Sequence, residues 1–494
     1  MTDPKDANIE TLELSRQKDG QVSTFSHGSI ETSIVSEREL SRELGFKEAL
    51  SIGLGGTIGG GVFSVFGIAA GFAGPAIILS FTFGGILAIF IAYSYSKLAL
   101  RYQSAGGSYT YCREAFGKYF GGAFGWLLWT GYLASCALYA YTFGSFFAHM
   151  VLGEGASATT VKIVTSVLAA VIIILSTAIN LVGVKETGKS QNIIVLIKVV
   201  ILVLFIVITI YPAIKNAPTN LKPFFGDTEG NGLDVGTGIA MAIVGTSILF
   251  VAFEGMELIP NASEEIQNPE KNIPRSIFGT VIIATILYLL VAFTALGGTK
   301  YTIFANDPDK AEYALAIAAE PVLGKAGFII ITLGALFSTA SAFNASLYGS
   351  SRLTYVMARE GIFPNFFQIV SKKSRVPFIS ILTISGITLV FTLVLDLKQI
   401  AHLASSIFLL LFAVIALASL ILRKEIKANF ILPLLGFLIS LTLFGIFFWN
   451  LITDVKLGVE GSLTTLILLP VLIVVMTIGS IITIKLQEKK KVES

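Results

Sequence analysis

The sequence predicts an all-α integral membrane protein with 12 transmembrane helices, and three observations carry this prediction. Hydrophobic residues make up 54% of the 494 residues and charged residues only 14%, whereas a soluble domain carries roughly 25% charged residues. From Leu50 onward, apolar runs long enough to cross a bilayer alternate with short polar segments. Two of these runs are interrupted near their centres by glycines or carboxylates, which indicates a solute-binding site inside the membrane.

The N-terminal segment, residues 1 to about 45, is polar and rich in Ser, Thr, Glu and Lys. It lacks the apolar stretch of a secretory leader, so we expect a disordered cytoplasmic tail and no cleaved signal peptide. The formal net charge of +3 is too small to favour a nucleic acid partner. Two cysteines, Cys112 and Cys136, exclude a disulfide-rich scaffold.

Residues 46–485 form the predicted membrane domain, followed by a short cytoplasmic tail at 486–494. We expect a first five-helix block at about 46–213, a second at about 236–422 and two peripheral helices at about 430–485. The predicted spans are 48–72, 74–98, 121–150, 161–183, 191–213, 236–261, 275–297, 326–351, 377–395, 400–422, 430–452 and 463–485.

The positions of Lys and Arg predict the orientation of these spans. With the N-terminus inside, 26 of them lie in the tails and cytoplasmic loops and 8 in the outer loops. Because basic residues are enriched on the cytoplasmic side, both termini are expected in the cytoplasm of a multi-pass cell membrane protein. An even number of spans requires both termini to lie on the same side, which agrees with this orientation.

The first span contains six glycines among the nine residues 53–61. Each glycine weakens a helix by roughly 1 kcal/mol relative to alanine. These glycines surround the helix axis, whereas close helix packing requires them on one face only. We therefore expect the helix to be unwound here, with backbone groups that line a cavity or contact a bound solute.

The sixth span carries Glu254, Gly255, Glu257 and Pro260 inside an apolar run. An isolated charge in the membrane costs at least a few kcal/mol, so each carboxylate requires compensation. Glu257 is explained by the first turn of a second half-helix, whose dipole stabilises an anion. Glu254 has no such explanation, and a position facing the cavity stays open for it.

The two interrupted spans each begin a five-helix block, and an odd block length makes the second block inverted relative to the first. This arrangement is typical of secondary transporters that bind their solute between two discontinuous helices. Free N–H groups at the new half-helix suit a carboxylate, and free carbonyls at the preceding half-helix ends suit an ammonium. A zwitterionic amino acid satisfies both. The predicted substrate-binding residues are Thr57, Ile58, Gly59, Gly60, Gly61, Phe250, Val251, Phe253 and Glu254.

Three stretches, GGTIGGGVF, FVAFEGMELIPNASEEIQNPEKNIPRSI and ASLYGSSRLTYVMAREGIFP, occur at helices 1, 6 and 8. Through them the sequence resembles the amino acid, polyamine and organocation permeases. The resemblance implies two inverted five-helix repeats plus two peripheral helices. It also implies that the Gly60 and Gly61 amides hold the substrate carboxylate, while the Thr57, Val251 and Glu254 carbonyls hold the amine. Family members often have Ser or Thr where Gly60 stands, so a hydroxyl donor is missing here.

Lys198 lies inside the fifth apolar run. Burial disfavours the charged form of a lysine, which makes proton exchange possible there. The resemblance implies that Lys198 takes the place of sodium in sodium-coupled relatives, close to the helix 1 break and to helix 8. The alternative is that its ammonium extends to the cytoplasmic headgroups. Ser338, Thr339 and Ser341 on helix 8 are candidate partners of Lys198, or sodium ligands, although close helix packing also explains these small residues.

The spacing of His and Cys residues does not indicate a metal site, and no cofactor is expected. The sequence also shows no nucleophile paired with a general base, so it does not indicate an enzyme. The sequence thus predicts an amino acid permease that works by alternating access, with proton symport favoured. Exchange or sodium coupling remains open within transport. An amino acid sensor that binds without transporting is the alternative from another class.

Overall fold

The computed structural model describes residues 42, 44–153, 155–182, 184–227, 229–372, 374–459 and 461–493, and only the backbone of 184–190, 308 and 490–493. The expected disordered tail at 1–45 lies outside this part except for residues 42, 44 and 45. Over the described ranges the chain is helical, and its extended pairing is limited to two isolated bridges, Leu44 with Ile266 and Gly226 with Gly232.

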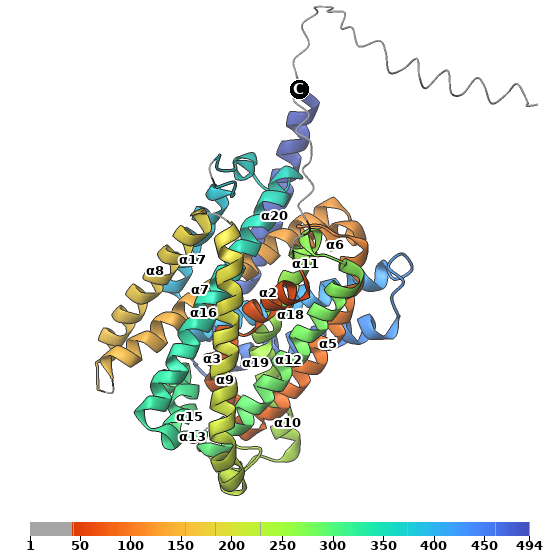
Figure 1. Cartoon of the computed structure of the whole chain (residues 1–494). Helices are drawn as coiled ribbons and strands as arrows, with labels where there is room; N and C mark the ends of the chain where they lie inside the picture. Colours follow the sequence, from red (N-terminus) through yellow and green to blue (C-terminus); the bar gives the residue numbers. More distant parts are fainter. Residues whose placement is uncertain are drawn as a thin grey trace, which may run out of the picture. The chain divides into compact units, whose positions relative to one another are not determined.

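The first five predicted spans coincide with helices, and short helices connect some of them (Figure 1). In order they are α2 (Phe46–Thr57), α3 (Gly60–Phe63), α4 (Val65–Ala73), the 3₁₀ turn η1 (Gly74–Ala76), α5 (Ile77–Arg101), α6 (Gly107–Phe116), α7 (Lys118–Leu152), α8 (Ala158–Val182) and α9 (Val184–Asn220).

The second half of the chain also begins with an interrupted helix. Its elements are α10 (Val235–Leu249), η2 (Phe250–Glu257), α11 (Leu258–Asn261), η3 (Ser263–Glu265), α12 (Pro269–Gly298), α13 (Thr302–Ala305), α14 (Pro308–Glu312), α15 (Ala314–Leu323), α16 (Lys325–Arg359), η4 (Asn365–Gln368), α17 (Phe378–Val394), α18 (Leu397–Ile421), α19 (Ile431–Lys456) and α20 (Ser462–Glu493). α20 continues through most of the segment 486–494 that the sequence predicts as a tail.

Within the described residues, nine helices are long and apolar enough to cross a membrane. α7 is not among them despite its 35 residues, because it contains many Gly, Tyr, Ser and Thr residues. α17 is too short by this measure, and the first predicted span is divided between α2, α3 and α4. A helix therefore lies in each of the twelve predicted ranges, while twelve membrane crossings stay a prediction.

α7 is surrounded by other helices. It packs against α16, α8, α18, α6 and α20, and α12 lies beside α9 and α5 (Figure 1). The tyrosines Tyr132 and Tyr139 of α7 are buried. The polar side chains of α7 thus face other helices instead of lipid, which explains why its sequence is less apolar than that of a peripheral span.

Candidate functional site

The first break separates α2 from α3. α2 ends at Thr57, Gly59 adopts an extended conformation (φ −128°, ψ −146°), and α3 begins at Gly60. The Gly59 N–H donates to the Thr57 carbonyl at 3.0 Å and does not continue the α-helical pattern. Because α3 starts anew, its first N–H groups, including those of Gly60 and Gly61, have no acceptor within the helix.

The second break takes a different form. α10 ends at Leu249, and the eight residues Phe250–Glu257 form the 3₁₀ helix η2 before α11 begins at Leu258. Runs of 3₁₀ helix longer than 3 to 4 residues are uncommon, and those inside a helix often mark functional hinges. The interruption predicted in the sixth span is thus present, as a tightened helix and not as an open loop.

The two breaks touch through their backbones. A Cβ atom added to Gly255 would lie 2.0 Å from the Thr57 nitrogen and 2.3 Å from the Gly56 carbonyl carbon. A Cβ atom on Gly61 would lie 2.6 Å from the Ala252 Cα atom. Distances below 3.0 Å to backbone atoms leave no room for a side chain, so glycine at both positions lets η2 approach α2 and α3.

Lys198 extends from α9 to the end of α2 and is fully buried, with 0% of its surface exposed. Its ammonium donates to the Gly55 and Ile58 carbonyls, both at 2.7 Å. A cation is favourable at this place because the C-terminal end of a helix carries a partial negative charge. The Lys198 side chain therefore lies at the break between α2 and α3 and does not extend to the headgroups. Its part in proton coupling stays a prediction.

Of the three predicted partners on α16, Ser341 is the one that the structure brings to Lys198, with its hydroxyl 3.5 Å from the ammonium. The Ser341 hydroxyl also accepts from the Gln191 amide at 3.0 Å. The Thr339 hydroxyl donates to carbonyls of its own helix. Ser338 is buried, and its hydroxyl has no partner among the described residues.

Tyr288 of α12 joins the two breaks, and the sequence analysis missed it. Its hydroxyl lies 2.6 Å from the Thr57 carbonyl oxygen and 3.0 Å from that of Ala252. Thr57 is one of the carbonyls predicted to bind a substrate amine. A carbonyl oxygen accepts two hydrogen bonds, and the Gly59 N–H also donates to the Thr57 carbonyl at 3.0 Å, so a substrate amine must displace one of these two donors to bind there. The only signal in the sequence is a tyrosine within an apolar run.

The Glu254 carboxylate points toward α7. The hydroxyls of Ser135 and Tyr139 donate to its two oxygens, and the side chain is 3% exposed. Tyr139 also lies 3.4 Å from the Gly56 carbonyl oxygen. Ser135 and Tyr139 are four residues apart, which places them on one face of α7. The sequence analysis missed both, although it singled out Glu254.

Glu257 is held by α5 and not by a helix cap. It precedes α11 without a side-chain capping bond, and its carboxylate accepts from the Tyr95 hydroxyl at 2.9 Å. The Tyr95 hydroxyl is also hydrogen-bonded to that of Ser108 at 2.9 Å. A buried hydroxyl that the sequence analysis did not name therefore compensates Glu257, while compensation by the helix dipole stays a prediction.

The predicted aromatic residues of the sixth span pack against one another and against neighbouring helices. The ring centroids of Phe250 and Phe253 are 6.0 Å apart, and Phe253 lies 5.5 Å from the Tyr288 ring. Phe250 is also in contact with Phe412 of α18, at 5.5 Å. Both phenylalanines and Val251 are at most 1% exposed. They form one wall of the region around the two breaks.

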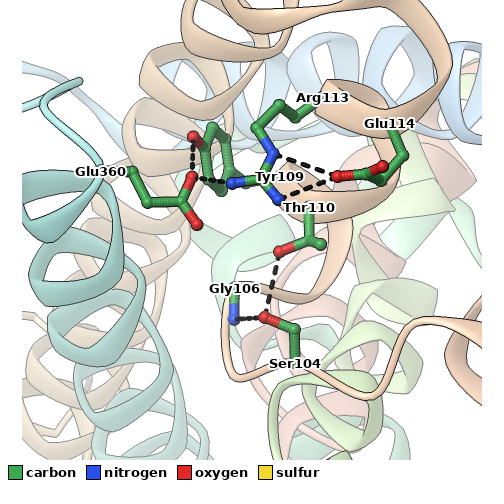
Figure 2. A network of polar contacts seen from close by, with 7 residues as sticks. All are labelled: Ser104, Gly106, Tyr109, Thr110, Arg113, Glu114 and Glu360. Atoms are coloured by element: carbon green, nitrogen blue, oxygen red, sulfur yellow. Dashed lines mark hydrogen bonds and ion pairs between the residues drawn. The ribbon is translucent and has the colours of Figure 1, made fainter.

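A polar network at one end of the bundle ties α6 to the end of α16, as Figure 2 shows. Arg113 pairs with Glu360 and, at 2.8 Å, with Glu114. The Tyr109 hydroxyl donates to Glu360 at 2.5 Å; burial, and then this carboxylate, raise the pKa of Tyr109. A second pair, Arg352 with Glu265 at 2.5 Å, joins α16 to the segment after α11.

Across the described ranges, no three His, Cys, Asp or Glu side chains are grouped to hold a metal ion. The polar groups around the breaks are instead backbone carbonyls, backbone N–H groups, hydroxyls, one ammonium and two carboxylates. Such a set is suited to binding a small polar solute.

Comparisons with known proteins agree with a site for a small polar solute. The profile of the family described as amino acid permease matches residues 48–491. An uncharacterised protein of Methanocaldococcus jannaschii is 32% identical over 410 residues, covering 82% of this chain and 88% of that protein. A methylthioribose transporter of Bacillus subtilis is 32% identical, covering 80% and 85%. The branched-chain amino acid permease BcaP of the same species is 27% identical, covering 82% and 86%.

Proposed function

Because this chain belongs to the amino acid permease family, we propose that it is a secondary transporter that moves amino acids across the cell membrane by alternating access. In this proposal twelve helices cross the membrane, helices 1 to 5 and 6 to 10 are inverted repeats, and both termini are cytoplasmic. The inside excess of Lys and Arg supports this orientation.

The contact between the two breaks is the observation that carries the proposal. Gly255 approaches Thr57, and Gly61 approaches Ala252, so the end of α2 and the start of α3 lie against η2 in the interior. The amides of Gly60 and Gly61 bind the substrate carboxylate beside Gly59, because an anion is favoured at a helix N-terminus. The carbonyls of Thr57, Val251 and Glu254 bind the substrate amine.

Lys198 is the proposed proton-coupling residue. The protonated ammonium donates to two carbonyls at the end of α2, at 2.7 Å each. Charge-assisted hydrogen bonds are roughly twice as strong as neutral ones, so loss of the proton weakens the attachment of α2 to α9. Proton release and rearrangement of the break are thereby linked. Sodium coupling requires a sodium ion to find carbonyl ligands where this ammonium lies.

Uptake into proteoliposomes tests the proposal. The purified protein is supplied with labelled neutral, branched-chain and cationic amino acids under an imposed pH gradient or sodium gradient. Methylthioribose is added to the panel because a relative is named as its transporter. We expect accumulation of at least one amino acid that is driven by the pH gradient.

Other outcomes separate the alternatives. Accumulation that follows only the sodium gradient contradicts proton coupling, and uptake that requires an amino acid inside the vesicle indicates exchange. Binding of an amino acid without accumulation under any gradient contradicts transport and indicates a sensor.

A further inference from the structure

A second site lies away from the two breaks, in a cavity of about 790 Å³. Its lining comes from four separate segments: Arg42, the end of α5, the start of α12 and the connection between α18 and α19. This volume falls within the range of about 300 to 1,000 Å³ that is usual for small-molecule sites. The lining residues include Lys97, Leu100, Arg101, Lys271, Ile426 and Lys427.

The cavity has a strong positive charge. Five of its lining side chains are cationic, and two, Glu270 and Glu425, are anionic. Glu425 is already paired with Arg101 at 3.1 Å. In the described part of the chain, none of the ion pairs within 4.0 Å involves Lys97, Lys271 or Lys427. Three ammonium groups therefore line one cavity without a carboxylate partner.

Backbone geometry also distinguishes this cavity. Only three non-glycine residues in the described ranges have positive φ, and two of them line it: Asn268 at 45° and Lys427 at 51°. Asparagine adopts this conformation readily, whereas it is unfavourable for a lysine, and such backbone positions recur at ligand-binding sites. The positive-inside rule explains an excess of lysines on this side. It does not explain their convergence on a hollow with a strained lining.

We propose that this cavity binds a phosphate group, and that the phosphate belongs to the headgroup of an anionic phospholipid in the cytoplasmic leaflet. α5 belongs to an apolar candidate span that ends at Arg101, so Lys97 and Arg101 lie near the level of the headgroups. Leu100 and Ile426 give the cavity an apolar part that contacts the glycerol and the first acyl carbons. Basic pockets between helices on this side are suited to anionic headgroups.

Native mass spectrometry of the full chain, with equal amounts of phosphatidylglycerol and phosphatidylcholine added in detergent, tests the proposal. We expect wild-type protein to retain phosphatidylglycerol preferentially. In the double variant Lys97→Gln/Lys427→Gln, the fraction of protein that retains phosphatidylglycerol should fall at least five-fold. In Lys271→Gln it should fall by a smaller factor. The matched control, Lys162→Gln/Lys456→Gln, changes two exposed lysines, one near the start of α8 and one at the end of α19. It should behave as wild type.

A second measurement separates the lipid from a free anion. The unfolding midpoint is compared with added phosphatidylglycerol and with inorganic phosphate at matched ionic strength. Stabilisation by the lipid alone supports a headgroup, whereas equal stabilisation by inorganic phosphate supports a phosphate site without the lipid. Equal lipid retention by wild type and by both the double variant and Lys271→Gln, with no effect of inorganic phosphate, overturns the proposal.

Discussion

Single side chains satisfy the backbone groups that the two helix breaks expose. Lys198 donates to the Gly55 and Ile58 carbonyls, and Tyr288 lies within hydrogen-bond distance of the Thr57 and Ala252 carbonyls. An unsatisfied backbone group in the hydrocarbon region costs several kcal/mol. These two residues therefore make an irregular backbone possible at this depth, in addition to any role in transport.

Replacing Lys198 tests its part in coupling. Lys198→Met keeps most of the side-chain volume and removes the ammonium that donates to two carbonyls. We expect gradient-driven uptake to fall at least ten-fold while the protein is still expressed and folded. Lys162→Met, an exposed lysine on α8, serves as the control and should transport normally. Full pH-dependent accumulation by Lys198→Met would refute the proton role.

Replacing Tyr288 tests the bridge between the breaks. Tyr288→Phe removes only the hydroxyl and leaves the Thr57 and Ala252 carbonyls without it. We expect a loss of about 1 to 3 kcal/mol in the free energy of unfolding, seen as a lower thermal midpoint in detergent. Tyr211→Phe, a tyrosine with 74% of its surface exposed, should leave the midpoint unchanged. Equal midpoints for both variants would show that the bridge adds no stability.

Sequence alone identified the charged members of this site and one hydroxyl, that of Ser341, but not the other hydroxyls. Lys198 and Glu254 stand out because a charge in an apolar run requires a partner. Ser135, Tyr139 and Tyr288 do not stand out. Hydroxyl side chains are common in these helices, and many donate to a carbonyl of their own helix, as Thr339 does. Which hydroxyl reaches another helix depends on how the helices pack, and this information is absent from one sequence.

At the scale of elements, the two breaks differ in form. The six glycines within residues 53–61 predict an open break, and α2 does stop at Thr57. The sixth span carries fewer glycines and forms the 3₁₀ helix η2 instead. The carboxylates and Gly255 mark where the regular helix stops, but the choice between an open turn and a tighter helix depends on the contact of η2 with α2.

A methyl group at Gly255 tests that contact. The added Cβ of Gly255→Ala would lie 2.0 Å from a backbone nitrogen, so α2 and η2 must move apart. We expect a lower thermal midpoint and a loss of most transport activity. Gly386→Ala is the matched control in α17, because nothing lies within 4 Å of its added Cβ. If both variants keep wild-type stability and uptake, the two breaks are not held by close backbone contact.

Between α12 and α16, Glu312 of α14 contacts α7, and we expect this contact to depend on pH. Burial raises the pKa of the Glu312 carboxyl group to about 7, although hydrogen bonds from Ser145 at 2.5 Å and Tyr141 at 3.3 Å oppose this shift. Because the folded protein binds this proton more tightly than the unfolded chain does, the stabilisation is greatest below the ordinary carboxyl pKa. It is lost as the pH rises through about 7.

We therefore expect the thermal midpoint to fall between pH 5 and pH 8, and Glu312→Gln to flatten this dependence. Glu229→Gln, an exposed carboxyl group in a loop, should leave the dependence as in wild type. An unchanged pH profile in Glu312→Gln would show that this carboxyl group does not govern it.

At the scale of the whole molecule, hydropathy predicts where helices lie better than it predicts which of them face lipid. All twelve predicted ranges contain helix, but α7 is less apolar than a lipid-facing span because other helices surround it. The inverted relation of the two five-helix blocks stays a prediction from the odd block length. The basic cavity could not be predicted, because its lysines come from separate segments of the chain.

The central claim is that two interrupted helices bind an amino acid by its opposite charges. Competition against uptake of the transported amino acid, with its N-acetyl derivative and its methyl ester as competitors, tests this claim most directly. We expect the parent amino acid to compete fully and each blocked analogue to compete at least ten-fold more weakly. If either analogue competes as well as the parent, the corresponding group is not bound at the breaks, and the account is contradicted.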